Sequence, residues 1–248
     1  MTRPRVLIVR SGLNPFARVS ADAGVEVVEK SSHSIHPVTP APDAFAEPAD
    51  LAIFTSQVAV ERVAADASLR REFEESLRNG RVAAVGSATA ESLSAHGIEP
   101  SLVAAGSAEA LLDFLPKRLD GERIVLPCGE DAAKELPEGL RLRGAHVDCV
   151  VVYRKVPRPF DPELDASVRE APFAAFCVTS PSAATWLFGG LSDASAEILR
   201  RTPAVVLGRF TRRFLERHGV ERIEIAPEPR LASAVRALEE LATVPRGA

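Results

Sequence analysis

The sequence contains two copies of one α/β pattern, and this duplication limits the folds open to it more than any other feature. The segment AVGSATAESLSAHGI, which begins at residue 84, aligns with VLGRFTRRFLERHGV, which begins at residue 206. Both have glycine at their third and fourteenth positions and threonine at their sixth. Thr55-Ser56 in FTSQVAV likewise matches Thr179-Ser180 in VTSPSAA. Because the matches occur in the same order, we interpret the chain as a duplication that yields two similar domains.

Short apolar runs rich in β-branched residues alternate with helical patterns along both copies. Two of these runs match more loosely between the copies, LIVRSG with IVLPCG and ADAGVEVVEK with RLRGAHVDCVVV. Continuous apolar strands that alternate with helices are typical of parallel sheets covered on both faces. A length of 248 residues also favours two domains over one. The predicted strands are residues 5–10, 25–30, 51–56, 81–86, 123–128, 147–156, 173–180, 204–208 and 222–227.

Two proline-rich stretches follow equivalent strands of the two copies. They are HSIHPVTPAP, residues 33–42, and KVPRPFDP, residues 155–162. Proline fixes φ and discourages helix formation, so both stretches are predicted to be extended connectors. Their equivalent positions indicate that both cross from one domain to the other.

Composition and charge exclude several classes of protein. The net charge of −4 argues against a general nucleic-acid binder, although a local pocket could still be basic. No apolar run approaches the length of a membrane span, and no charged segment followed by an apolar one opens the chain. We therefore expect a cytoplasmic protein with neither a nucleic-acid nor a membrane partner. Cys128, Cys149 and Cys177 form no CxxC pair and are predicted to be reduced, buried thiols.

Hydroxyl residues gather just after the predicted strands, where ligands bind in a parallel α/β sheet. Backbone N–H groups at a helix start, helped by the helix dipole, can bind carboxylate or phosphate without a formal charge. Serine and threonine are also favoured there as N-caps, which is the simpler explanation for any one of them. Their repetition in both copies favours a shared ligand cleft. These residues are Ser56, Ser87, Thr89, Ser180, Ser182 and Thr211.

Motifs of other site classes are absent from the sequence. It has no GxGxxG or GxxxxGK[ST] phosphate loop and no GxSxG elbow. Gly106-Ser107 before an apolar run indicates a helix start. His33 and His36 have no acidic or cysteine partner at a ligand-like spacing, so we interpret them as surface residues and predict no metal site.

Tyr153 is the only tyrosine of the chain, and it ends the apolar run VDCVVVY just before Arg154 and Lys155. A phenol in a cleft beside positive charge could donate a proton or a hydrogen bond. Equally, it could pack its ring and form a local hydrogen bond. Its position alone does not separate these two interpretations.

The ordered segments resemble the uroporphyrinogen-III synthase family over nearly the full length of the chain. The most telling is LPEGLRLRGAHVDCVVVYRKV, residues 136–156, supported by the two TS strands and the two glycine–threonine turns. The resemblance implies an α/β fold of two similar, flavodoxin-like parallel-sheet domains with an active-site cleft between them. Residues 1–34 and 158–248 would form one discontinuous domain and residues 39–152 the other. A two-stranded extended linker, residues 35–38 and 153–157, would join them.

The resemblance also implies a reaction. A cyclising hydro-lyase of this family converts the linear tetrapyrrole hydroxymethylbilane into uroporphyrinogen III, with loss of water and inversion of ring D. The electron-rich pyrrole expels hydroxide by itself, so no cofactor is implied, and a monomer is expected. The alternative is a non-catalytic paralogue that binds a tetrapyrrole or another polyanion. A periplasmic solute receptor would share two lobes and a hinge, but it would need an export signal.

Site residues follow from the same resemblance. Tyr153 matches the tyrosine expected to donate a proton to the leaving group or to contact it, and Arg10 would pair with a substrate carboxylate. Two departures from the family pattern stand out. The second glycine turn reads Gly208-Arg209-Phe210-Thr211, where Arg209 would replace a lost hydroxyl as a carboxylate ligand. Asp131 and Lys134 lie in a segment where the family often has arginine. The residues expected to line the cleft are Ser56, Thr89, Ser180, Ser182 and Thr211.

Overall fold

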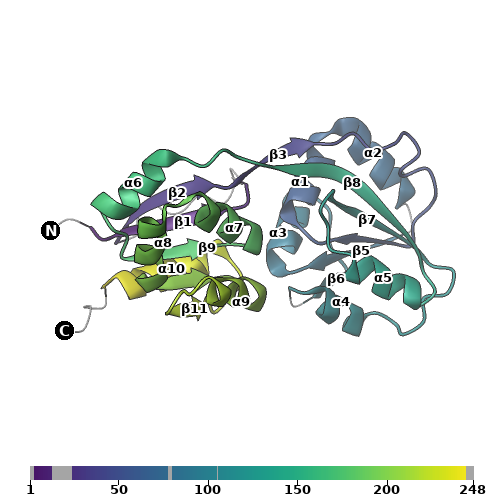
Figure 1. Cartoon of the computed structure of the whole chain (residues 1–248). Helices are drawn as coiled ribbons and strands as arrows, with labels where there is room; N and C mark the ends of the chain where they lie inside the picture. The colour runs from purple at the N-terminus through teal and green to yellow at the C-terminus, as the bar shows by residue number, and fades with distance from the viewer. Residues whose placement is uncertain (1–2, 13–23, 78–79, 105, 244–248) are drawn as a thin grey trace. The chain divides into compact units, whose positions relative to one another are not determined.

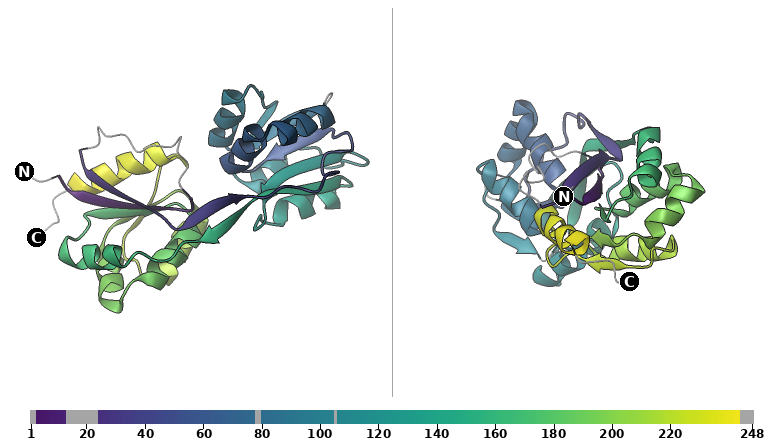
Figure 2. Two further views of the ribbon diagram at one scale, coloured as in Figure 1. Left: turned by 90° about the horizontal axis from the view of Figure 1, so that it is seen from above. Right: turned by 90° about the vertical axis from the view of Figure 1, so that its left-hand side faces the viewer.

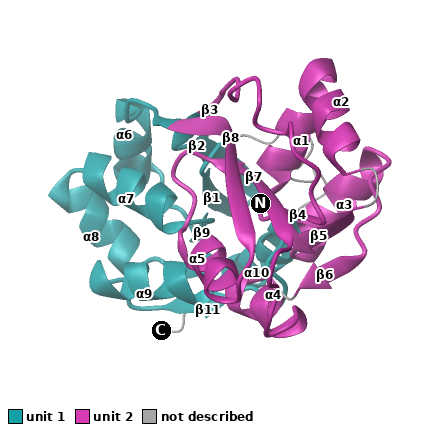
Figure 3. Cartoon of the chain, turned by 90° about the vertical axis from the view of Figure 1, so that its right-hand side faces the viewer, with its two compact units in different colours: residues 1–34, 156–248 teal, residues 35–155 magenta. Residues whose placement is uncertain are grey.

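A computed structural model describes residues 3–12, 24–77, 80–104 and 106–243, which form two α/β units (Figure 1). Unit 1 comprises Met1–Ser34 and Val156–Ala248, and unit 2 comprises Ile35–Lys155 (Figure 3). Each unit has its own mostly parallel sheet and its own hydrophobic cores on both faces of that sheet. Among the described residues, no helix combines the length and the apolar composition that crossing a membrane requires.

The sheet of unit 1 has five parallel strands in the order β11-β10-β9-β1-β2. Taken in chain order within the unit, this is the 2-1-3-4-5 arrangement of flavodoxin-like sheets. Buried aliphatic residues fill its central strands, as parallel strands covered on both faces require. The strands are β1 (Arg5–Arg10), β2 (Glu26–Ser31), β9 (Ala175–Val178), β10 (Ala204–Val206) and β11 (Ile223–Ile225).

Helices cover both faces of this sheet (Figure 2). α10 (Leu231–Thr243) packs its buried side against alternate strand residues such as Val6 and Ile8. The opposite residues, such as Leu7 and Val9, pack with the four other helices among the described residues of unit 1. These are α6 (Pro162–Glu170), α7 (Pro181–Gly190), α8 (Asp193–Arg201) and α9 (Arg209–Arg217).

The sheet of unit 2 has six strands in the order β3-β8-β7-β4-β5-β6. Without the edge strand β3, this is the sheet of unit 1 again, with β7 and β8 in the places of β1 and β2. The duplicated sequence segments therefore occupy equivalent positions in the two sheets. The strands are β3 (His33–Pro37), β4 (Leu51–Phe54), β5 (Arg81–Val85), β6 (Leu102–Ala104), β7 (Arg123–Gly129) and β8 (His146–Pro157).

Five helices complete the described part of unit 2. α1 (Gln57–Ala65), α2 (Ala67–Ser76) and α3 (Ser87–Ala95) pack on one face of the sheet, and α4 (Ala108–Phe114) and α5 (Glu135–Leu142) on the other. The repeated glycine at the end of each duplicated segment has a structural cause. Gly97 after α3 and Gly219 after α9 take φ of 75° and 81°, which a helix C-cap favours and a side chain would disfavour.

The nine apolar runs predicted as strands each contain or overlap a strand, while β3 and β6 are additional. β3 is the first half of the proline-rich segment 33–42 and lies beside β8. The N–H of Arg158 donates to Ser32 O at 2.9 Å and that of Val38 to Val152 O at 3.0 Å, which is the register of an antiparallel pair. The chain thus crosses between the units within two paired extended segments.

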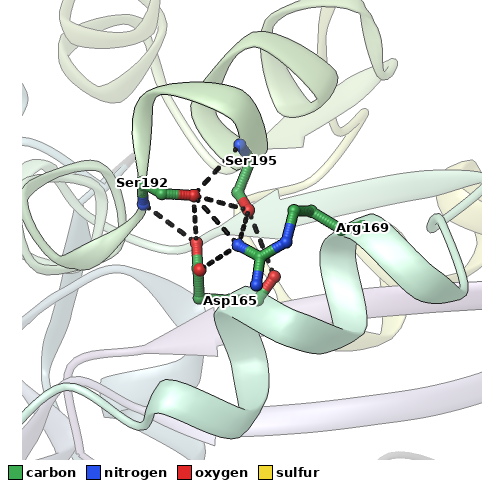
Figure 4. Close-up of polar contacts among 4 residues, drawn as sticks. All are labelled: Asp165, Arg169, Ser192 and Ser195. Carbon is green, nitrogen blue, oxygen red and sulfur yellow. Dashed lines mark hydrogen bonds and ion pairs between the residues drawn. The ribbon is translucent and has the colours of Figure 1, made fainter.

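In unit 1, a polar cluster fastens α6 to α8 (Figure 4). Asp165 accepts hydrogen bonds from the backbone N–H and the hydroxyl of Ser192, each at 2.9 Å, and forms an ion pair with Arg169. The Ser195 hydroxyl lies in the same cluster, where it donates to Asp165 O at 3.1 Å. Hydrogen bonds from Ser195, Ser192 and Arg169 hold the pKa of the Asp165 carboxyl well below its usual range.

This depressed pKa makes the contribution of Asp165 to stability depend on pH. The contribution is fully present above the unfolded-state pKa of about 3.9 and is lost as pH falls towards the folded-state value. We expect Asp165→Asn to lower the urea midpoint of unfolding at pH 7. The gap in midpoint between the variant and the parent protein should narrow below about pH 4. Circular dichroism at several pH values measures this. Glu221→Gln, an exposed change of the same charge in unit 1, is the control, and an equal gap for Asp165→Asn at all pH values would contradict the prediction.

Candidate functional site

Each sheet reverses its strand order once, and the carboxyl ends of the two strands at that point are where open α/β sheets bind ligands. In unit 1 these strands are β1 and β9, and in unit 2 they are β7 and β4. The residues predicted from sequence to contact a ligand follow these strands or the neighbouring β10 and β5, except Arg10, which ends β1, and Tyr153, which lies in β8. The topology alone therefore predicts one ligand-binding edge in each unit.

At this edge of unit 2 lies a cavity of about 410 Å³. Residues that follow β4 and β7 form part of its lining, and the end of β8 supplies Tyr153 and Lys155. Lys155 Nζ forms an ion pair with Asp131 at 3.1 Å, so this edge carries both an ammonium group and a carboxylate. The polar lining residues include Thr55, Ser56, Ser107, Asp131, Tyr153 and Lys155.

Ser56 is a helix N-cap, as one of the two interpretations predicts, and it also lines the cavity beside Tyr153. It is the N-cap of α1, where its Oγ accepts from the N–H of Ala59 at 3.2 Å. The same Oγ lies 3.3 Å from the Tyr153 phenol oxygen. Since an N-cap serine contributes about 1 kcal/mol to helix stability, a change at Ser56 would alter stability and site together. Tyr153 is the cleaner position for testing the site.

A register irregularity sets the direction of Tyr153. Cys128 on β7 pairs with Val151 on β8, but the next residue, Gly129, pairs with Tyr153, so β8 carries one extra residue at Val152. Side chains alternate along a regular strand, yet Val152 and Tyr153 both belong to one core cluster. A bulge of this kind re-aims a side chain, and here it brings the phenol towards Ser56.

Gly129 leaves room for the tyrosine ring, and sequence reasoning missed it. A Cβ atom at residue 129 would lie 2.7 Å from Cζ of Tyr153 and 2.9 Å from its hydroxyl oxygen, closer than real contacts allow. Tyr153 is 5% exposed, so its ring has little freedom to move away. The available signal was the glycine directly after the strand RIVLPC, at the place that Ser11-Gly12 take after the first strand.

The equivalent edge of unit 1 carries three serine hydroxyls in mutual contact. Ser180 is the N-cap of α7 and accepts from the N–H of Ala183 at 3.2 Å. Its Oγ hydrogen-bonds to Ser11 and lies 3.0 Å from Ser182 Oγ, which is itself 3.0 Å from Ser11 Oγ. The structure thus brings together the predicted residues Ser180 and Ser182 and adds Ser11, which sequence reasoning did not select.

Thr89 and Thr211 occupy equivalent places, each third in its helix, and both are buried, at 4% and 5% exposure. Thr89 is not among the residues that line the cavity of unit 2. Ser87, the first residue of α3, does not line it either. Both threonines are therefore buried residues of the first turns of α3 and α9.

The two predicted arginine ligands lie in different environments. Arg10, at the end of β1, is 7% exposed and forms an ion pair with Glu29 of β2. The carboxylate that Arg10 contacts in this structure thus belongs to the protein. Arg209 is the first residue of α9 and is exposed, and no ion pair is recorded for it among residues 3–12, 24–77, 80–104 and 106–243.

The prediction of three buried thiols is wrong for Cys149. Cys128 and Cys177 are buried, but Cys149 is exposed and lines the cavity of unit 2 together with Cys128. Its place on β8 beside the cavity leaves the Cys149 side chain open to solvent. No cluster of three or more metal-ligating His, Cys, Asp or Glu side chains occurs in the described part of the chain.

Comparison with known proteins decides the family. The model of the family Uroporphyrinogen-III synthase HemD matches residues 14–236, which is most of the chain. The chain belongs to the uroporphyrinogen-III synthase family. The expectation from sequence is thereby confirmed, and the flavodoxin-like two-unit fold is that of this family.

Individual relatives agree with this assignment. A protein of Methanothermobacter thermautotrophicus, whose name provisionally gives it as a uroporphyrinogen-III synthase, is 35% identical over 183 residues, covering 70% of this chain and 71% of that protein. A uroporphyrinogen III synthase mutant from Thermus thermophilus has a TM-score of 0.63 at 23% identity, with 95% of this chain and 98% of that chain covered. A uroporphyrinogen-III synthetase from Helicobacter pylori has a TM-score of 0.64 at 17% identity, with 97% and 100% covered. At these identities the two structures establish the fold.

The contact between Gly129 and Tyr153 generates a prediction for this family member. Because Tyr153 is the only tyrosine, labelling with ¹³C at tyrosine Cζ gives a single NMR resonance. We expect Gly129→Ala to shift this resonance, since the added Cβ displaces the ring. Gly189→Ala, where a Cβ meets no atom within 4 Å, should leave it in place. An unshifted resonance in Gly129→Ala would show that the ring does not rest on this glycine.

Proposed function

We propose that this chain cyclises hydroxymethylbilane to uroporphyrinogen III, with loss of water and inversion of ring D. Its membership of the uroporphyrinogen-III synthase family supports the reaction class, a cyclising lyase of porphyrin biosynthesis. The observation that carries the proposal to particular residues is the Tyr153 phenol, held beside Ser56 at the edge of the sheet where α/β proteins bind ligands.

The chemistry places modest demands on the protein. The electron-rich pyrrole of the substrate expels hydroxide and becomes a cation. The pyrrole ring at the far end of the linear substrate then attacks this cation. Uncatalysed closure gives the uninverted isomer. The protein's main contribution is therefore to hold the substrate so that attack occurs at the substituted carbon. Its second contribution is stabilisation of the departing hydroxide and of the cation. We propose that protein side chains and backbone N–H groups make both contributions, without a cofactor.

Tyr153 is proposed to donate its proton to the leaving hydroxyl. Ser56 Oγ already accepts from the N–H of Ala59, which leaves its own proton available for the Tyr153 oxygen 3.3 Å away. With the phenol oxygen accepting from Ser56, the phenol proton is the one left to point into the cavity. In this proposed arrangement, the hydrogen bonds from Ala59 to Ser56 and from Ser56 to Tyr153 orient the phenol as a donor towards the substrate.

The substrate carries many carboxylates, and we propose neutral donors and one exposed cation as their ligands. In unit 2 these are Ser56 and the N–H groups at the start of α1. In unit 1 they are Ser180 and Ser182, with Arg209 at the start of α9. Arg10, Thr89 and Thr211 remain proposed ligands, and because all three are buried, the proposal requires the substrate to reach below the surface at the end of β1 and at the first turns of α3 and α9.

The second candidate is a non-catalytic binder of a tetrapyrrole or another polyanion, favoured by the altered turn Gly208-Arg209-Phe210-Thr211. Product identity separates the two. The protein is incubated with porphobilinogen and the deaminase that makes the bilane, and the oxidised products are separated by isomer. The enzyme proposal requires the type III isomer. Formation of the type I isomer alone would refute it and leave the binder.

Tyr153→Phe tests the donor role directly. Phenylalanine keeps the buried ring but removes the hydroxyl, so binding and folding should change little. Loss of a positioned proton donor should lower kcat by about a hundredfold. Steady-state kinetics with freshly made bilane measure it, and the unfolding midpoint serves as the folding control. A variant with the parent's kcat would show that Tyr153 only packs and hydrogen-bonds locally.

Arg209→Ala tests the exposed cation. If Arg209 binds a substrate carboxylate, its removal should raise KM by about tenfold, equivalent to about 1.4 kcal/mol, with kcat nearly unchanged. Arg217→Ala is the matched control, because it removes the same charge from the other end of α9. Equal KM values for the two variants would show that Arg209 is a surface residue that does not bind the substrate.

A further inference from the structure

The cavity of unit 2 contains an ion pair that proton donation by Tyr153 does not use. Among the described residues that line the cavity, Lys155 carries the only ammonium or guanidinium group and Asp131 the only carboxylate. The two side chains meet at 3.1 Å. A carboxylate is unexpected in a cavity whose proposed ligand is a polycarboxylate, because like charges oppose binding. Asp131 thus opposes such a ligand at the place where Lys155 attracts it.

A tight turn after β7 holds Asp131. The N–H of Ala132 donates to Gly129 O at 3.0 Å, which makes Asp131 the third residue of the turn. The N–H of Glu130 donates to Tyr153 O at 3.0 Å, so the turn is hydrogen-bonded to β8. These backbone hydrogen bonds hold Asp131 at the cavity independently of its ion pair.

The two members of the pair differ in exposure. The side chain of Lys155 is 27% exposed, whereas that of Asp131 is 56% exposed. An ion pair with so exposed a partner contributes little net stability, because water competes for both charges. Lys155 can therefore exchange Asp131 for another carboxylate at little cost and stay at the cavity.

We propose that Lys155 binds one carboxylate of the substrate in exchange for Asp131, and that Asp131 weakens this binding by competing for the same ammonium group. The inference rests on the proposed function, since the substrate supplies the carboxylate. Lys155 lies two residues after Tyr153, so the carboxylate is held on the strand that carries the proposed proton donor. Asp131 acts as a built-in competitor that keeps the affinity for a carboxylate product low enough for release.

Binding of uroporphyrin III tests the exchange without any turnover. This polycarboxylate is the oxidised form of the proposed product, and titration calorimetry measures its affinity for the full-length protein. Lys155→Gln should weaken binding by about tenfold, because it removes a charge-assisted contact. Asp131→Asn should tighten binding by about threefold, because the competing carboxylate is gone. In the background of Lys155→Gln, Asp131→Asn should change nothing, since Asp131 acts through Lys155.

Lys134→Gln and Glu130→Gln are the matched controls. They remove the same charges from the same loop, but neither residue lines the cavity, so each should bind uroporphyrin III with nearly the affinity of the parent. Unfolding midpoints of all variants check that the fold is kept.

Opposite signs for the two single variants are what the exchange requires. If the ion pair only fastened the turn to β8, both variants would shift the affinity in the same direction. That result, or an unchanged affinity in Lys155→Gln, would overturn the exchange. The isomer of the enzymatic product decides the proposed function separately, so type III product with same-sign binding changes would reject the exchange alone.

Discussion

The extra residue in β8 is the constraint on which the candidate site depends. β8 pairs with β7 inside unit 2 and then continues as the strand that leads back to unit 1. A regular strand would place Tyr153 on the face of Cys149 and Val151. With one residue inserted against β7, Tyr153 joins Val152 on the opposite side, where Ser56 and the backbone of Gly129 meet it. The phenol reaches the ligand-binding edge because the strand is irregular there.

The two units show how one duplicated edge acquires different chemistry. Ser56 and Ser180 come from the same TS motif, and both cap the helix that follows. Ser56 contacts a phenol, whereas Ser180 contacts two further hydroxyls. The fold requires a helix N-cap at this position, whereas the second hydrogen-bond partner of the serine can differ between the units. A structural role and a candidate functional role thus share one side chain, which explains why neither interpretation of these serines excluded the other.

Most of the fold follows from local pattern in the sequence, because buried parallel strands leave continuous apolar runs. β6 has three residues at a sheet edge, too few for a pattern. β3 lies in a proline-rich segment, and proline is tolerated there because the strand is at an edge. The site was less predictable, since it depends on pairings between distant strands. The bulge at Val152, the room made by Gly129 and the ion pair of Arg10 with Glu29 are all set by register, which no single segment encodes.

The charges at the two edges indicate how a polycarboxylate would be held. Lys155 is paired with Asp131 and Arg10 with Glu29, so both of these cations are already neutralised by the protein. Arg209 is exposed, where water and salt weaken its attraction for an anion. Under the proposed function, specificity for many carboxylates comes from oriented neutral donors, which select geometry more than charge. A reaction whose outcome is decided by how a flexible chain is folded before closure requires this kind of selection. It also favours release, because neutral donors bind a carboxylate product less tightly than a ring of unpaired arginines would.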